Sequence, residues 1–147
     1  MTRRQKPALH ASTVILGRRG ILVRGKSGSG KTTLCQNLID HWSQLGKFAA
    51  WVCDDQTLYE EKENSILASA PVSIAGLKEN RFGGIIKIPH QQITVLDLEV
   101  CLVPNGHLDR LPENISSDRF SSLPSIKVPE KSSKIAIELI SERLDQI

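Results

Sequence analysis

The eight residues Gly25–Thr32, Gly-Lys-Ser-Gly-Ser-Gly-Lys-Thr, constrain the fold of this 147-residue chain more than any other feature. They match the phosphate-loop pattern Gly-x-x-x-x-Gly-Lys-[Ser/Thr] at every fixed position. The run Gly20–Arg24 before them is typical of a short buried strand, and Thr32–Leu45 after them has the spacing of an amphipathic helix. A strand that turns through glycines into a helix directs backbone N–H groups and the positive end of the helix dipole into one concavity. A glycine-rich turn that binds nothing does not require this context, so we expect a nucleoside triphosphate site.

The loop supplies specific groups for that ligand. Its candidate nucleotide-binding residues are Gly25, Lys26, Ser27, Gly28, Ser29, Gly30, Lys31 and Thr32. The Lys31 ammonium can reach the β- and γ-phosphates, and the Thr32 hydroxyl can ligate Mg²⁺. Because Arg18, Arg19 and Lys26 flank the loop in the sequence, we expect them to help dock a partner.

The bulk properties narrow the class of protein. The length predicts a single domain, residues 1–147, that is large enough to bury a core. The three cysteines, Cys35, Cys53 and Cys101, are widely spaced and form no Cys-x-x-Cys pair, which argues against a zinc site or a disulfide framework and fits a reducing compartment. A net charge of only +3 with 4% aromatic residues disfavours nucleic acid as a partner. No apolar run has the length of a membrane span, so we expect a cytoplasmic protein without a membrane partner.

Apolar patterning predicts an α/β fold in which a mixed or mainly parallel sheet with flanking helices surrounds the phosphate loop. Predicted strands cover residues 11–16, 21–24, 48–53, 56–59 with 65–68 as a hairpin, 85–88 and 93–103. The helix after the loop is expected to place Leu34, Leu38, Ile39, Trp42 and Leu45 on one apolar face and to end at Gly46. A short helical pattern lies within residues 71–82, a loop is expected over 105–123, and a final helix over 133–144 has Ile135, Leu139, Ile140 and Leu144 as its apolar stripe.

Two acidic sites could serve the phosphate loop. The nearly continuous apolar run Phe48–Cys53, typical of a strand buried on both faces, ends in Asp54 and Asp55. The run Ile93–Leu96 ends in Asp97 and resembles the metal-binding strand of phosphate-loop enzymes. Because the alternation of apolar and polar residues continues beyond Asp97, we favour the first site and interpret Asp97 as a strand residue on an exposed face.

These features follow one another in a particular order: His10, an edge hairpin, the phosphate loop, the Asp54-Asp55 strand end, and Glu79-x-Arg81-x-x-Gly84-Ile85-Ile86. The order resembles the catalytic domain of bacterial HPr kinase/phosphorylase, a family with a histidine ahead of its loop, an Ala-Asp-Asp type strand end and a signature close to Leu-Leu-Glu-Ile-Arg-Gly-Leu-Gly-Ile-Ile. The matching stretch here is Leu77–Ile86. The resemblance covers His10–Val103 well and the remainder more loosely. Without the amino-terminal domain of longer members, the chain looks like the short form found in alphaproteobacteria.

The resemblance implies a protein kinase that uses ATP and Mg²⁺, acts on a serine of an HPr-type phosphocarrier protein, can run the reverse phosphorolysis, and assembles as a hexamer. It also implies roles for single residues: Asp54 as general base, His10 as the group that orients it, Lys31 on the β/γ-phosphates, Thr32 and Glu79 on Mg²⁺, and Arg81 and Asp55 as supporting groups. A base-activated hydroxyl that attacks a γ-phosphate is also sensible chemistry for these residue types.

The chain departs from the family pattern at Asn80, Phe82 and Gly83 in the signature, and at Glu130–Lys134, where the family has a Pro-Gly-Arg-Asn type turn. These departures bear on phosphorolysis and subunit packing more than on nucleotide binding. Two alternatives remain open from the sequence. One is a phosphate-loop kinase of a small metabolite, and the other is a nucleotide-binding regulator without catalysis.

Overall fold

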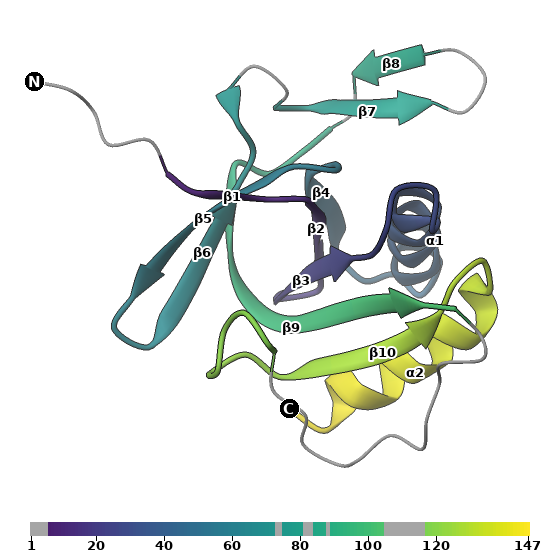
Figure 1. Cartoon of the computed structure of the whole chain (residues 1–147). Coiled ribbons are helices and arrows are strands. Elements are labelled where there is room, and N and C mark those ends of the chain that lie inside the picture. The colour runs from purple at the N-terminus through teal and green to yellow at the C-terminus, as the bar shows by residue number, and fades with distance from the viewer. Residues whose placement is uncertain (1–5, 73–74, 81–83, 88, 105–116) are drawn as a thin grey trace, which may run out of the picture.

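The structure, a computed structural model, describes residues 6–72, 75–80, 84–87, 89–104 and 117–147, without the side chains of 78–80 and 84–87. A mixed eight-stranded sheet forms its centre, and two helices pack on it (Figure 1). The main elements are β1 (Ala8–Leu9), β2 (Ala11–Leu16), β3 (Arg19–Arg24), α1 (Lys31–Gln44), β4 (Ala49–Cys53), β5 (Thr57–Lys62), β6 (Ser65–Ser69), β9 (Ile93–Val103), β10 (Ser125–Pro129) and α2 (Ser133–Asp145). A separate hairpin pairs β7 (Leu77–Asn80) with β8 (Gly84–Lys87).

The strand order is β1-β5-β6-β9-β3-β2-β4, and β10 also pairs with β9. The pairs β3–β9 and β9–β10 are parallel, and the other pairs in this sheet are antiparallel. The predicted mixed sheet with flanking helices is therefore confirmed. Since β3 and β4 both run antiparallel to β2, they point the same way, and their carboxyl ends meet at one edge of the sheet.

Two apolar clusters pack against the sheet, one on each of its faces. Ile21 and Val23 of β3 pack in the larger cluster with residues of α1 and α2, whereas Leu22 between them packs in the smaller one. This alternation follows from the period of two along a strand. Both helices therefore cover the same face of the sheet, and α1 starts directly above the carboxyl edge. None of the helices in the described ranges is long and apolar enough to span a membrane.

The first helix differs from its prediction at its carboxyl end. Gly46 has a φ of 74° and ends the helix as expected. Leu45, however, is 56% exposed and does not join the apolar face, and Phe48 is 55% exposed ahead of β4. Both predictions were wrong because the helix ends at Gln44 and the chain leaves the core until Ala49.

The second helix is rotated by about one residue from its predicted stripe. Ile135 is 51% exposed, so that prediction was wrong, whereas its neighbour Ala136 is buried together with Ile140. Leu139 and Leu144 are partly buried against the larger cluster. A small residue at Ala136 lets α2 approach the sheet closely, and periodicity that counts large apolar residues alone misses it.

Two connections differ more strongly from the sequence analysis. In the described part of residues 71–82, Leu77–Asn80 forms strand β7 rather than a helix, because it pairs with Gly84–Lys87. Strand β10 was not predicted, since Pro124 and Pro129 at its ends are typical of loops. Parallel pairing with Glu99–Val103 of β9 nevertheless holds it in the sheet.

Candidate functional site

The phosphate loop connects β3 to α1 and depends on its glycines. Gly28 and Gly30 have φ angles of 80° and 100°, a region that side chains with a Cβ rarely adopt. A Cβ on Gly25 would lie 2.5 Å from the Ser29 hydroxyl oxygen, which packs inside the loop. Glycine is therefore needed at position 25 because the Ser29 side chain leaves no room for a Cβ, and at position 30 because of the positive φ.

Lys31 is buried within this loop. Its Nζ donates hydrogen bonds to the carbonyl oxygens of Gly25 and Lys26, at 3.1 and 3.3 Å. It also lies 3.3 Å from Nε2 of His10 and 3.7 Å from a carboxylate oxygen of Asp55. Residues from three separate segments therefore meet at this ammonium, and the carboxylate that lies beside His10 is that of Asp55, whereas the resemblance implies Asp54.

Asp54 follows β4 and is 6% exposed. Its Oδ1 accepts hydrogen bonds from the Thr32 hydroxyl at 2.8 Å and from the Ser12 hydroxyl at 2.9 Å. Because the Thr32 proton points to Asp54, the oxygen lone pairs of Thr32 are free to face a metal ion beside the phosphates. Hydroxyl and carboxylate oxygens are ligands that Mg²⁺ prefers, with substrate phosphates completing its shell. Thr32 and Asp54 thus fit a magnesium site by their chemistry.

Asp55 occupies a different environment from its neighbour. Its side chain is 55% exposed, lies 3.5 Å from Nε2 of His10, and forms part of the cavity wall. Its φ of 65° is unusual for a residue with a Cβ, and its backbone N–H donates to the Ser12 hydroxyl. This backbone conformation lets consecutive carboxylates face different ways, Asp54 into the protein and Asp55 toward the cavity.

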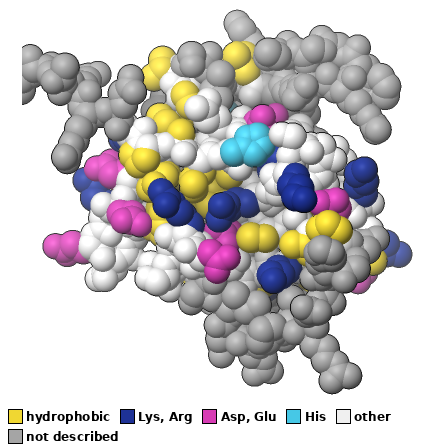
Figure 2. All heavy atoms as spheres, viewed as in Figure 1, with side chains coloured by type: hydrophobic (Ala, Val, Ile, Leu, Met, Phe, Trp, Pro, Cys, Tyr) yellow, Lys and Arg dark blue, Asp and Glu magenta, His cyan; other side chains and the backbone are white. Residues whose placement is uncertain are grey.

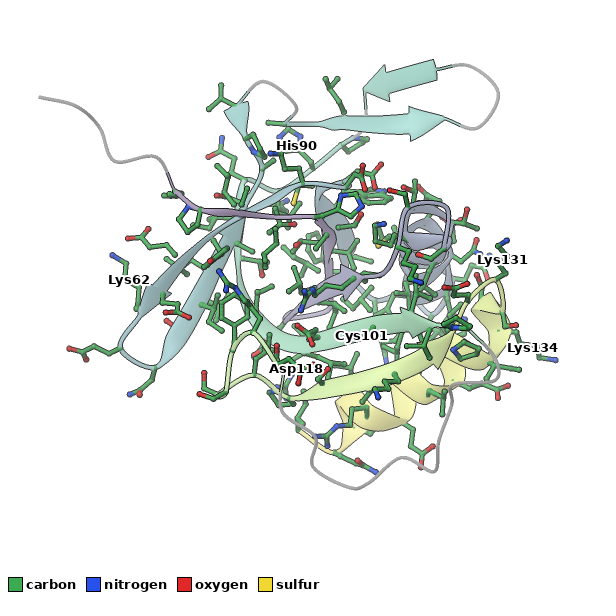
Figure 3. The ribbon with its side chains drawn as sticks, viewed as in Figure 1. Lys62, His90, Cys101, Asp118, Lys131 and Lys134 are labelled. Atoms are coloured by element: carbon green, nitrogen blue, oxygen red, sulfur yellow. The ribbon has the colours of Figure 1, made fainter. Side chains whose placement is uncertain are left out.

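The loop opens into a cavity of about 750 Å³, within the usual range of small-molecule sites, about 300–1,000 Å³. One wall is the phosphate loop and the start of α1. The other is formed by Leu102 of β9, Pro129 of β10, and the turn and first residues of α2, including Lys131 and Ser132. Figure 3 shows Lys131 at this turn beside α1. The sequence pattern does not predict this second wall, because it does not predict β10.

Two thiols lie close to the site without joining it. Burial raises the pKa of Cys35 on α1, and the nearby charge of Asp54 raises it further. Burial also raises the pKa of Cys53, which packs in the core as predicted. A raised pKa keeps a thiol neutral, and a neutral thiol is a weak nucleophile. Neither group is therefore suited to the chemistry of the cavity.

Other residues considered in the sequence lie away from the loop, as expected for Asp97, or outside the described residues. Asp97 accepts a hydrogen bond from the backbone N–H of Gly20, at the start of β3 and away from the loop. Arg19 also lies at that end, where it donates to the backbone carbonyl of Ile147. Arg18 precedes it in the β2–β3 turn, so these two arginines flank the loop in the sequence but lie away from it in the structure. Glu79 is in β7 with its side chain outside the described residues, and Arg81 lies wholly outside them.

The charge on the visible surface is mixed. On the face shown in Figure 2, Lys and Arg side chains alternate with acidic and apolar ones and form no continuous basic surface.

Within the described residues, no three His, Cys, Asp or Glu side chains gather as a metal cluster. A magnesium ion held by one carboxylate, one hydroxyl and phosphate oxygens does not need such a cluster.

No family model matches the chain. Among curated proteins, the HPr kinase/phosphorylase of Geobacillus thermodenitrificans is 34% identical over 116 residues, which is 71% of this chain and 35% of the relative. The HPr kinase/phosphorylase of Clostridium tetani is 32% identical over 114 residues, 76% of this chain and again 35% of the relative. The chain thus spans about a third of the length of these two relatives.

A solved structure shares the fold. The Hpr(Ser) kinase/phosphatase from Coxiella burnetii matches with a TM-score of 0.78 and 22% identity, over 96% of this chain and 99% of that chain. At this identity the likeness establishes the fold and not the activity. Together with the sequence matches, it relates this chain to the HPr kinase/phosphorylase family.

Proposed function

From this kinship in sequence and fold, we propose that the chain transfers the γ-phosphate of ATP to a serine of an HPr-type phosphocarrier protein. The observation that supports it most is the meeting of Lys31, Asp55 and His10 beside a phosphate loop at the mouth of one cavity. Phosphoryl transfer needs a bound phosphate chain, neutralised charge and a group that accepts the hydroxyl proton. Candidate residues for all three needs lie within reach of one another here.

The geometry favours a division of labour that reverses the one implied by the resemblance. Asp54 is buried and already accepts hydrogen bonds from two hydroxyl groups, so we assign it to orienting Thr32 and to the metal. Asp55 faces the cavity and is more than half exposed, so a serine on the surface of another folded protein can reach it. We therefore propose Asp55 as the base that takes the serine proton, with His10 orienting its carboxylate.

Lys31 would bind the β- and γ-phosphates after leaving the carbonyl oxygens that it now contacts. Mg²⁺ held by Thr32 and Asp54 would offset the negative charge of the phosphates when bound. Glu79 and Arg81 remain proposed as metal-binding and supporting residues on the strength of the family signature. Phosphorolysis and hexamer assembly likewise remain proposals.

The test is to incubate the protein with Mg²⁺, γ-labelled ATP, an HPr-type carrier, and a mixture of sugars and nucleosides. We expect the label on a serine of the carrier, located by mass spectrometry of the intact protein and its peptides. Label on a sugar or nucleoside would replace the proposal with a small-metabolite kinase. ATP binding by calorimetry without transfer to any acceptor would favour a nucleotide-binding regulator.

A further control concerns acceptor recognition. Arg81→Ala is expected to lower carrier phosphorylation more than it lowers ATP affinity, because we propose a supporting role in the reaction for this residue, which lies outside the phosphate loop in the sequence. A parallel loss of both properties would contradict this assignment. Arg18→Ala, at the opposite end of β3 from the loop, serves as the matched control and is expected to change neither.

A further inference from the structure

The cavity wall opposite the phosphate loop carries an unassigned cation. Lys131 lies in the turn between β10 and α2 and lines the cavity together with Ser27 and Lys31 on the other side. In the part of the chain that the structure describes, its ammonium makes no hydrogen bond or ion pair. Lys31, by contrast, is bound by two carbonyl oxygens. Lys131 thus places a positive charge in the cavity wall, and within the described residues no other side chain or carbonyl group binds this charge.

The backbone holds this lysine in a costly conformation. Lys131 has a φ of 57°, a region that glycine and asparagine adopt readily and lysine does not. The backbone N of Lys131 lies 4.0 Å from the position that a Cβ on Gly30 would occupy, so the turn approaches the phosphate loop itself. A strained residue at this distance from a ligand loop is the kind of observation that points to a role in binding.

The turn is also fixed relative to the loop. The backbone N–H of Glu130 donates to the carbonyl oxygen of Val103 at 2.8 Å, which ties the turn to β9. The Asn37 amide of α1 donates to the Ser133 hydroxyl at 2.9 Å, which ties the first residue of α2 to the helix that follows the loop. The two walls therefore form one rigid frame, and a ligand gripped by one wall meets the other.

We propose that this turn is the second wall of the nucleotide site and that Lys131 binds the phosphate chain of the nucleotide from the side opposite Lys31. The proposal rests on the proposed nucleotide binding and extends it to a residue outside the phosphate loop. An ammonium without an internal partner binds phosphate oxygens through charge-assisted hydrogen bonds, which are stronger than neutral ones. The apolar atoms of Leu102 and Pro129 leave the rest of this wall suited to the nucleoside.

The experiment compares calorimetric titrations of four proteins with Mg-ATP and with tripolyphosphate, which has the phosphate chain but no nucleoside. Lys131→Asn removes the charge and keeps a residue that tolerates a positive φ, so the fold is preserved and a thermal melt verifies it. Lys131→Arg restores the charge. Lys134→Asn is the matched control, since Figure 3 shows Lys134 projecting outward from α2 and it does not line the cavity.

We expect Lys131→Asn to lower the affinity for both ligands about tenfold, a loss typical of one charge-assisted contact. Lys131→Arg and Lys134→Asn should bind like the unaltered protein. Unchanged affinity in Lys131→Asn, or a loss for ATP without a loss for tripolyphosphate, would overturn the assignment to the phosphate chain. If all four proteins bind ATP as expected but no carrier is phosphorylated, the proposed function fails while this inference stands. If the unaltered protein does not bind ATP, both fail together.

Discussion

Carboxylates accompany apolar strands at two places in the sheet, the end of β4 and the middle of β9. At the first, Asp54 and Asp55 contact Thr32, Lys31 and His10 around the phosphate loop. At the second, the carboxylates are occupied by structural partners. Asp97 accepts a hydrogen bond from the backbone N–H of Gly20. Glu99 lies in a buried network on the face of the sheet opposite the helices. Similar sequence patterns therefore contribute to the candidate site in one place and to the stability of the fold in the other.

Strand direction explains the difference. Strands β3, β4 and β9 all point the same way, so a side chain is near the phosphate loop only if it follows the carboxyl end of its strand. Asp54 and Asp55 come directly after β4 ends at Cys53. Asp97 is the fifth residue of β9, whose partner at this level is the beginning of β3. The residues at the carboxyl end of β9, such as Leu102, do reach the cavity.

Glu99 illustrates the structural use of a carboxylate most clearly. It is 1% exposed and sits in the centre of β9. Its oxygens accept hydrogen bonds from Arg24 at 3.2 Å, Ser117 at 2.7 Å, Ser125 at 2.8 Å and the Cys101 thiol at 3.3 Å. A buried carboxylate is tolerated only when donors surround it in this way. The network joins the residue before the phosphate loop to β10 and to the segment that leads into it.

The largest effect in this comparison is expected at the end of β4. Asp55→Asn should slow carrier phosphorylation by about 10²- to 10⁴-fold, because an amide cannot take the serine proton. ATP affinity should change little, since in the proposed function the loop binds the phosphates. Single-turnover kinetics with labelled ATP measure the first property, and calorimetry the second. Full activity in this variant together with loss in Asp54→Asn would return the role of base to Asp54.

A stability effect of intermediate size is expected in β9. Glu99→Gln keeps the shape of the side chain, but its amide nitrogen cannot accept the hydrogen bonds that one carboxylate oxygen accepts. The unsatisfied donors should lower the free energy of unfolding by about 1–3 kcal/mol. Denaturant titration measures it, with Glu138→Gln on the exposed side of α2 as the control. A loss no larger than in the control would show that the network does not stabilise the fold.

The sequence predicted much of the site because its main parts are local. Each of these parts is formed by consecutive residues, so periodicity or a motif identifies it. They are the loop, its flanking strand and helix, and the Asp54-Asp55 strand end. The second wall of the cavity could not be predicted in this way. It depends on β10, which has prolines at both ends and is held by parallel pairing with a strand more than twenty residues earlier in the chain. The network of Glu99 likewise joins residues that are distant in the sequence.

The division of roles between Asp54 and Asp55 was also beyond the sequence. Two adjacent acids after a strand predict a site, but only the positive φ of Asp55 turns one carboxylate to the cavity while the other contacts Ser12. Side-chain burial then distinguishes the two. The errors at Leu45 and Ile135 have simpler causes. Leu45 continues the apolar pattern past the end of α1, and Ile135 is a large apolar residue next to the small residue Ala136, which is the one that is buried.

A smaller effect is expected at Asp97. Asp97→Asn retains an oxygen that can accept the N–H of Gly20, and the position is only partly buried, so the loss of unfolding free energy should stay below about 1 kcal/mol. Carrier phosphorylation should be unchanged, because Asp97 contacts the amino-terminal end of β3, away from the phosphate loop. The same kinetic and denaturant measurements apply. An inactive but folded variant would mean that β9, and not β4, supplies the functional carboxylate.

The smallest expected effect is a pH dependence of the Cys101 thiol in β9. Burial, and then the neighbouring charge of Glu99, raises the pKa of the Cys101 thiol from 9.0 to about 11. The folded state therefore favours the neutral thiol. This contribution to stability is complete below pH 9 and is lost as the pH rises through 11. Because the thiolate is the reactive form, alkylation of Cys101 should be slow at pH 8 and accelerate toward pH 11. Removing the nearby charge in Glu99→Gln should lower the pKa and speed alkylation at pH 8, as followed by mass spectrometry, with Cys101→Ser giving the background from Cys35 and Cys53. Equal rates with and without the Glu99 charge would contradict the carboxylate as a cause, and would leave burial as the sole origin of the raised pKa.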